Sequence, residues 1–354
     1  MLFRSNEKLI WDENSGKENQ VSLENAPITD IVYHAVEDYY FPEGYGDALS
    51  QSGITVTRTS DTQITISGMP TDNVYITLPL PEYGGDKDKW DGVTVATSYE
   101  SGDGMEGSPY VIANAEQFAY FAQQLTAGVG IDAYYELTAD LEMTSANWKT
   151  IPMFEGHFDG NGHTVVYTLK DTIQSSFSCY GLFGEVYGTI YDLKVSGDIL
   201  LSSPRMMQYV YIGGLCGYLG GTITHCGSDV EIRCDTDPIV MRPMIGGITG
   251  SMDDGIVEYS SYSGFVQWEA TAANNSNAIA GGIAGEICDG AIHQCFNRGS
   301  LTVNCYSTAY VGGIAGHIYT WDTSVTTTID NSYHMGNISS ACIKIGRASC
   351  RERV

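Results

Sequence analysis

Two Asp-Gly pairs stand at equivalent positions of a repeating sequence, and they are the strongest candidates for chemistry in the chain. Asp254 and Asp289 each follow the first glycine of a repeat by seven residues. Carboxylates stacked one coil apart can hold Ca²⁺, or act as acid and base on a glycan. An Asp-Gly pair also suits a tight corner that needs no ligand. We favour the corner, keep Asp254 and Asp289 as calcium candidates, and expect no metal or cofactor.

The histidines form no peptidase motif. A zinc peptidase needs His-Glu-x-x-His on one helix face, and none of the seven histidines provides it. His157 and His163 bracket Asp159, which could indicate a metal site, but the Asp-Gly-Asn-Gly run that starts at Asp159 predicts a hairpin turn with solvated histidines beside it. We therefore expect no catalytic residues.

Cysteine and tyrosine are the other reactive residue types. Paired Cys-x-x-Cys spacing, which structural zinc requires, is absent. Cys226 and Cys295 stand where an earlier repeat has Leu193, so we expect small, buried, free thiols. The 24 tyrosines, including Tyr209, Tyr211 and Tyr218, could form a surface that contacts a sugar or a protein. Core filling explains many of them equally well.

Composition excludes several function classes. Of 354 residues, 17 are Lys or Arg and 43 are Asp or Glu, giving a formal net charge of −26. A phosphate backbone would be repelled, so we expect no nucleic-acid partner. No run approaches the ~20 apolar residues of a transmembrane helix, and no signal-peptide pattern is present. The 41 glycines favour many tight turns over long helices.

The elements that must position these residues are mostly strands. Alternation of apolar and polar residues around 54–57, 63–66 and 74–78 predicts a small β domain over 6–80. Residues 81–108 are rich in Gly, Asp, Glu and Ser and resemble a linker. One amphipathic helix is expected from Asn114, its N-cap, to Leu125, with Gln117 reaching back. Strand and turn patterns then continue through a second domain over 109–344.

A Gly-(Leu/Ile)-x-Gly element recurs five times in that domain, and its first glycines are 33, 33, 35 and 31 residues apart. A second apolar position follows at Val186, Leu219, Met252, Ile287 and Ile318, and a third at Ile190, Ile223, Ile256 and Ile292. Ankyrin and tetratricopeptide repeats have similar periods but are helical, which this glycine content excludes. A propeller blade needs a longer repeat. The pattern predicts a β-solenoid, one coil per repeat, wound right-handed. The repeat glycines are Gly181, Gly184, Gly214, Gly217, Gly247, Gly250, Gly282, Gly285, Gly313 and Gly316.

The five copies resemble GLUG motifs, and 110–165 resembles the leader that precedes them in bacterial surface proteins. The resemblance covers roughly 90–340. It implies an all-β chain with a right-handed parallel β-helix and one short capping helix, displayed outside the cell in adhesin-like proteins or as an accessory region of IgA-specific zinc peptidases. It implies no catalytic residue. The fifth copy departs from the pattern through an insertion around 319–328.

The N-terminal domain has a resemblance of its own. Asp38 to Pro42 and the segment 53–68 are similar to the immunoglobulin-like repeats of bacterial surface proteins, which implies a small β-sandwich-like fold.

The two ends of the chain resemble a different kind of sequence. Residues 345–354 (IGRASCRERV) resemble the translation of a common sequencing adapter, and 1–5 resemble the same adapter read from the other strand. We therefore expect both ends to be foreign to the natural protein and the chain to be a fragment.

These observations favour a non-catalytic extracellular adhesion or structural module of a bacterial surface protein, with a host protein or glycan as partner. The alternatives are a carbohydrate-active β-helix enzyme, either a polysaccharide lyase or a glycoside hydrolase, and an accessory region of a larger secreted peptidase. Signal peptide and anchor are expected outside the fragment.

Overall fold

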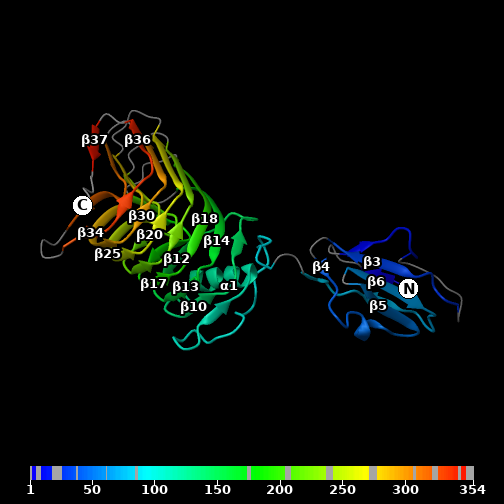
Figure 1. Cartoon of the computed structure of the whole chain (residues 1–354). Coiled ribbons are helices and arrows are strands. Elements are labelled where there is room, and N and C mark those ends of the chain that lie inside the picture. The colour runs from blue at the N-terminus through cyan, green and yellow to red at the C-terminus, as the bar shows by residue number, and fades with distance from the viewer. Residues whose placement is uncertain are drawn as a thin grey trace. The chain divides into compact units, whose positions relative to one another are not determined.

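A computed structural model describes residues 2–4, 9–17, 26–36, 39–60, 62–83, 87–173, 177–203, 209–236, 242–270, 277–305, 308–320, 326–341 and 344–347. The chain divides into two compact units, 1–87 and 88–354 (Figure 1). Residues 88–108, expected to belong to a linker, lie in the second unit. Trp90, Val95 and Tyr99 pack against its core, so these polar-rich residues are anchored by a few aromatic and aliphatic side chains.

The first unit is an antiparallel sheet domain. Its four-stranded sheet has the order β2 (Leu9–Trp11), β3 (Ile31–Ala35), β6 (Gln63–Gly68) and β5 (Ile54–Ser60). Ile31, Tyr33, Ile64 and Ile66 alternate with more exposed residues and form one buried face. The unit also contains two short strand pairs, β4 (Tyr39–Tyr40) with β8 (Glu82–Tyr83) and β1 (Leu2–Arg4) with β7 (Tyr75–Thr77). A 3-10 turn, η1 (Asp47–Leu49), precedes β5.

The second unit is the predicted parallel β-solenoid. Each coil adds strands to three parallel sheets, so the colour of Figure 1 advances steadily along the stack. The largest sheet among the described residues has 12 strands. They are β9 (Tyr110–Ile112), β10 (Tyr134–Leu137), β12 (Ile151–Phe154), β13 (His157–Asp159), β16 (Phe183–Val186), β17 (Thr189–Tyr191), β20 (Cys216–Leu219), β21 (Thr222–Thr224), β25 (Thr249–Glu258), β29 (Ala284–His293), β33 (Ala315–Tyr319) and β34 (Thr328–Asp330).

The second solenoid sheet has 11 described strands. They are β11 (Leu141–Met143), β14 (Thr164–Thr172), β18 (Lys194–Ser203), β22 (Gly227–Ser228), β23 (Glu231–Thr236), β26 (Ser261–Tyr262), β27 (Phe265–Ala270), β30 (Phe296–Asn297), β31 (Ser300–Asn304), β35 (Tyr333–His334) and β36 (Ile338–Ala341).

The third solenoid sheet has six described strands, and the first five directly precede the five repeat elements. They are β15 (Phe177–Tyr180), β19 (Tyr209–Gly213), β24 (Arg242–Gly246), β28 (Asn277–Gly281), β32 (Thr308–Gly312) and β37 (Lys344–Arg347). In β37, residues 345–347 pair with β32, and 348–354 lie outside the described residues. The adapter interpretation of the two ends stays a prediction.

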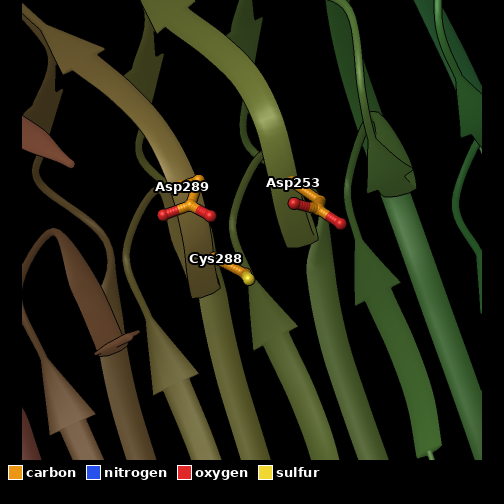
Figure 2. Close-up of side chains that lie close together, drawn as sticks. All are labelled: Asp253, Cys288 and Asp289. Carbon is orange, nitrogen blue, oxygen red and sulfur yellow. The ribbon is translucent and has the colours of Figure 1, made fainter. Parts of the chain in front are cut away.

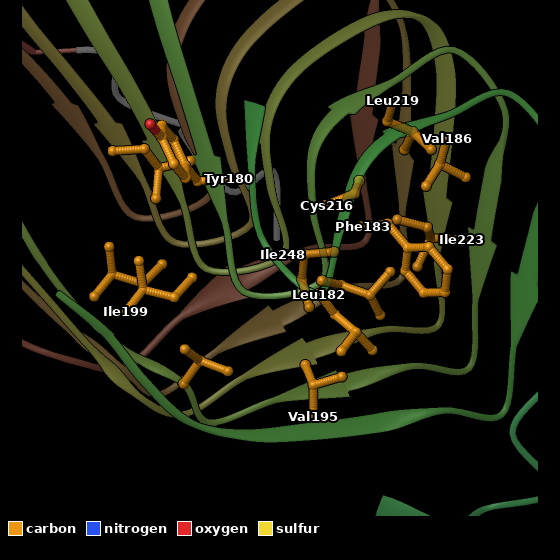
Figure 3. Close-up of a cluster of buried hydrophobic side chains, with 14 of the residues drawn as sticks. Tyr180, Leu182, Phe183, Val186, Val195, Ile199, Cys216, Leu219, Ile223 and Ile248 are labelled. Atoms are coloured by element: carbon orange, nitrogen blue, oxygen red, sulfur yellow. The ribbon is translucent and has the colours of Figure 1, made fainter. Parts of the chain in front are cut away.

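The core is a set of stacked apolar rows. The Leu or Ile of each repeat element is almost fully buried, and each row continues from coil to coil (Figure 3). That row consists of Leu182, Leu215, Ile248, Ile283 and Ile314. Each Å² of apolar surface removed from water contributes about 25 cal/mol of stabilisation. Stacking in continuous rows therefore stabilises coils that could not bury an apolar face alone.

One register expectation was wrong. The third apolar row runs through Ile190, Ile223, Val257 and Ile292, because Ile223 pairs with Val257. Ile256 is instead 38% exposed. The third coil contains one more residue than the second between its two apolar rows, and Asp254 takes up the extra length in a left-handed conformation, with φ of 57°.

The single α-helix among the described residues, α1 (Ala115–Thr126), starts where the sequence predicts. The Asn114 side chain accepts from the Gln117 backbone N–H at 2.9 Å, and Gln117 Oε1 accepts from Ala113 N–H. Phe118 and Phe121 point into the first coil, where Phe118 stacks on Trp148. The helix therefore belongs to the solenoid core. No helix in the described part of the chain is long and apolar enough to span a membrane.

Candidate functional site

Outward-facing tyrosines gather on the first two complete coils, because the parallel register places equivalent positions of successive coils beside one another. In the third sheet Phe177 pairs with Tyr209, and Cys179 pairs with Tyr211. In the largest sheet Glu185 pairs with Tyr218. Side chains at such paired positions lie directly beside one another on the same face. Two rows of aromatic and polar side chains thus meet across the corner made by Gly181 to Gly184.

An open pocket of about 400 Å³, a volume within the range of small-molecule sites, lies here and is lined by Phe177, Cys179, Glu185, Tyr187, Tyr211 and Tyr218 among others. The Tyr218 ring lies 5.8 Å from the Tyr187 ring and 6.0 Å from the Tyr211 ring, centre to centre. Phe177 is 65% exposed and stacks on Tyr209. Three aromatic walls around an opening give a ligand flat, stiff surfaces that lose little conformational entropy on contact.

The polar groups of the pocket are hydroxyls, the Cys179 thiol and one carboxylate, that of Glu185. Tyr187 donates to Glu185 Oε2 at 3.0 Å. Burial, followed by the neighbouring Glu185, raises the pKa of Tyr187 to about 12. Burial also raises the pKa of Tyr211 to about 12. Both phenols therefore stay protonated near neutral pH and can donate hydrogen bonds as well as accept them.

A second group of polar side chains borders this pocket on coils three and four. Asp253 lies in β25, and Cys288 and Asp289 lie in β29 (Figure 2). One ligand atom from each of the three side chains lies within 4.8 Å of the others. Tyr218 connects the two groups, because its hydroxyl donates to Asp253 Oδ2 at 3.4 Å. We call Asp253, Cys288 and Asp289 the acidic thiol cluster.

The structure therefore brings one of the two calcium candidates into a cluster. Asp289 joins it, while Asp254 is exposed and lies outside it. Both aspartates have positive φ, 57° for Asp254 and 53° for Asp289, which fits the tight-corner interpretation of Asp-Gly. The partner of Asp289 is Asp253, one residue earlier than expected.

Burial and like charge shape the electrostatics of the acidic thiol cluster. Burial, then the neighbouring Asp254, raises the pKa of Asp253. Burial, then the charge of Asp253, raises the pKa of Cys288 to about 11, so the thiol keeps its proton at neutral pH. Among the described residues, no ion pair reaches Asp253 or Asp289. Arg242 instead binds Glu286 at 2.8 Å.

Sequence reasoning missed Tyr187, Asp253 and Cys288, which belong to one row of five equivalent repeat positions. Each is the sixth residue after the first glycine of its repeat: Tyr187, Gly220, Asp253, Cys288 and Tyr319. The ladder pairs Asp253 with Cys288 and Cys288 with Tyr319. A Cβ at Gly220 would lie 2.7 Å from the Tyr187 ring, so glycine leaves room for the pocket. Reading this sixth position down the repeats would have found the cluster.

The histidine pair expected near a turn does not converge. His157 stacks on Tyr134 at 4.4 Å, while His163 contacts Asp140 at 3.2 Å. The hairpin expectation for this segment was wrong, because β13 and β14 belong to different parallel sheets. The Asp-Gly-Asn-Gly run makes a corner of a coil, with Asn161 and Gly162 at positive φ.

None of the seven cysteines in the described part of the chain forms a disulfide there. Cys226 and Cys295 are 3% and 1% exposed and continue the row of Leu193, as the repeat alignment indicated. Burial raises the pKa of each to about 12, which makes these two thiols poor nucleophiles. Cys342 and Cys350 lie outside the described residues.

Comparisons with known proteins reach one solved structure. The chain is similar to the crystal structure of a putative immunoglobulin A1 protease from Bacteroides ovatus, with a TM-score of 0.41 and 19% sequence identity over 68% of this chain and 87% of that chain. No family model matches the chain. A search of curated proteins also finds no match.

Proposed function

We propose that the chain is a non-catalytic adhesion module of a bacterial surface protein, and that it binds through the tyrosine pocket on its first two coils. The single observation that carries this proposal is the open aromatic pocket around Tyr187, Tyr211 and Tyr218. Stacked coils supply a rigid scaffold for these rings, and a preorganised aromatic surface spends little entropy on binding. A glycan or a loop of a host protein is the occupant that such a surface suits.

Several finer assignments belong to the same proposal. The repeats with glycines from Gly181 to Gly316 are GLUG-type coils of a right-handed β-helix. The first unit is an immunoglobulin-like repeat, and the whole chain is exposed outside the cell. The acidic composition argues against a nucleic-acid partner and leaves glycans and proteins as partners.

The test measures binding of the full chain to a glycan array and to a panel of host surface proteins. For any ligand found, Tyr187→Ala and Tyr211→Ala should each weaken binding at least about tenfold, which corresponds to ~1.4 kcal/mol. Tyr333→Ala removes a comparably exposed tyrosine that lies outside the pocket. It should leave the affinity unchanged.

Two results would contradict the proposal. Equal losses for the pocket variants and for Tyr333→Ala would place recognition elsewhere. Absence of any ligand in both panels would favour a purely structural spacer.

A further inference from the structure

The acidic thiol cluster places two carboxylates and a thiol close together, and no Lys, Arg or His side chain of the described residues pairs with either carboxylate. Cys288 is 5% exposed and Asp289 is 6% exposed, so neither is solvated like a surface side chain. Asp289 Oδ1 is buried and has no hydrogen-bond partner among the described residues. A buried carboxylate oxygen without a donor is costly, and native structures usually satisfy such an atom with a partner or an ion.

The surrounding charges do not supply that partner. Arg242 and His317, on neighbouring coils, both contact Glu286, each at 2.8 Å. Tyr218 donates to Asp253 and leaves Asp289 Oδ1 unaffected. Negative charge therefore accumulates at Asp253 and Asp289 across the ladder between coils three and four.

We propose that Asp253, Cys288 and Asp289 form a binding site for one divalent transition-metal ion of the zinc class. Zinc takes carboxylate oxygen at about 2.0–2.2 Å and thiolate sulfur at about 2.3 Å, which puts tetrahedral ligand atoms about 3.6 Å apart. The observed ligand atoms lie within 4.8 Å of one another, so each pair has to close by on the order of 1 Å at most. On binding, the Cys288 S–H bond breaks, its electron pair forms the metal–sulfur bond, and the proton leaves to solvent.

The donor set selects among cations. Calcium and magnesium prefer shells built from six or more oxygen atoms, whereas a buried thiol is a soft ligand that favours zinc and related metals. This site differs from a calcium pair at Asp254 and Asp289, because it uses the thiol and excludes Asp254. Three protein ligands leave a fourth position, which water fills in many zinc sites.

The experiment uses the full chain, stripped with a chelator and then titrated with Zn²⁺ and separately with Co²⁺. We expect one tightly bound Zn²⁺ per chain by calorimetry and metal analysis. Co²⁺ should give a near-ultraviolet charge-transfer band, because such a band requires a cobalt–thiolate bond. A tenfold excess of Ca²⁺ should not displace the bound Zn²⁺.

Matched variants separate the cluster from adventitious binding. Cys288→Ser should abolish the charge-transfer band, and Asp289→Asn should weaken Zn²⁺ binding at least about tenfold. Asn tolerates the positive φ of Asp289, so this variant keeps the local backbone. Asp254→Asn and Cys179→Ser remove a nearby carboxylate and a thiol outside the cluster, and they should keep both the band and the affinity.

The proposal is overturned if the wild-type chain binds no Zn²⁺ or gives no charge-transfer band. It is equally overturned if the control variants lose as much affinity as Cys288→Ser and Asp289→Asn. Circular dichroism spectra that match the wild type show that a variant has folded, and Asp253→Asn replaces any variant that fails this check. The outcome is independent of whether the tyrosine pocket binds a ligand.

Discussion

The glycines of the repeat element lie where neighbouring segments of the chain come very close to one another. A Cβ at Gly282 would overlap Asn297 Nδ2 and the carbonyl oxygen of Gly313, and a Cβ at Gly247 would overlap the Tyr262 ring and the carbonyl oxygen of Gly282. Neither glycine has a positive φ. Close approach of neighbouring chain segments, and not backbone conformation, therefore requires glycine at these positions.

Gly282→Val should destabilise the protein by at least ~2 kcal/mol, because the added side chain must push the Asn297 side chain or the next coil away. Gly107→Val is the matched control, since a Cβ at Gly107 meets no atom within 4 Å. It should change stability by no more than about 0.5 kcal/mol. Denaturant unfolding followed by circular dichroism measures both. A Gly282→Val protein as stable as its control would remove the physical reason for the repeat.

At the scale of elements, repetition made the solenoid predictable. Five in-phase glycine elements fixed the coil length, and the buried row from Leu182 to Ile314 follows directly from their spacing. Local bulges were harder to predict. One extra residue near Asp254 shifts the third apolar row from Ile256 to Val257, and both residues are apolar. The acidic thiol cluster was missed for a different reason. Two of its members, Asp253 and Cys288, lie 35 residues apart in sequence and become neighbours only once the register is known.

Helix α1 gives a prediction at this scale, because it packs on the first coil as part of the core. Phe118 is fully buried and stacks on Trp148 at 5.5 Å. Phe118→Ala should therefore cost about 3 kcal/mol, the lower part of the range for deleting a buried aromatic ring. Gln123→Ala, at an exposed position of the same helix, should change stability by less than about 0.5 kcal/mol. Similar losses for both variants, measured by thermal unfolding, would argue against a core role for α1.

At the scale of the whole molecule, the solenoid presents two neighbouring features on one side of its coils. The tyrosine pocket belongs to coils one and two, and the acidic thiol cluster belongs to coils three and four. Tyr218 lines the first and contacts Asp253 in the second. A bound metal ion would thus stiffen the ladder that supports one wall of the pocket, which links the two proposals physically while leaving their tests separate.

The last prediction concerns the alternative that the chain is a carbohydrate-active enzyme. A lyase or hydrolase needs an acid and a base converging on one sugar, and retaining and inverting hydrolases hold their carboxylates at about 5–10 Å across an accessible bond. In the acidic thiol cluster Asp289 is withdrawn from solvent and Asp253 is partly buried, and the pocket itself contributes Glu185 beside tyrosines. The full chain should therefore release no reducing ends or unsaturated sugars from plant, mucin or bacterial polysaccharides, with or without Ca²⁺ or Zn²⁺. Turnover that disappears in a Glu185→Gln or an Asp254→Asn/Asp289→Asn variant, while a Tyr333→Ala control keeps it, would replace adhesion by catalysis as the function of these coils.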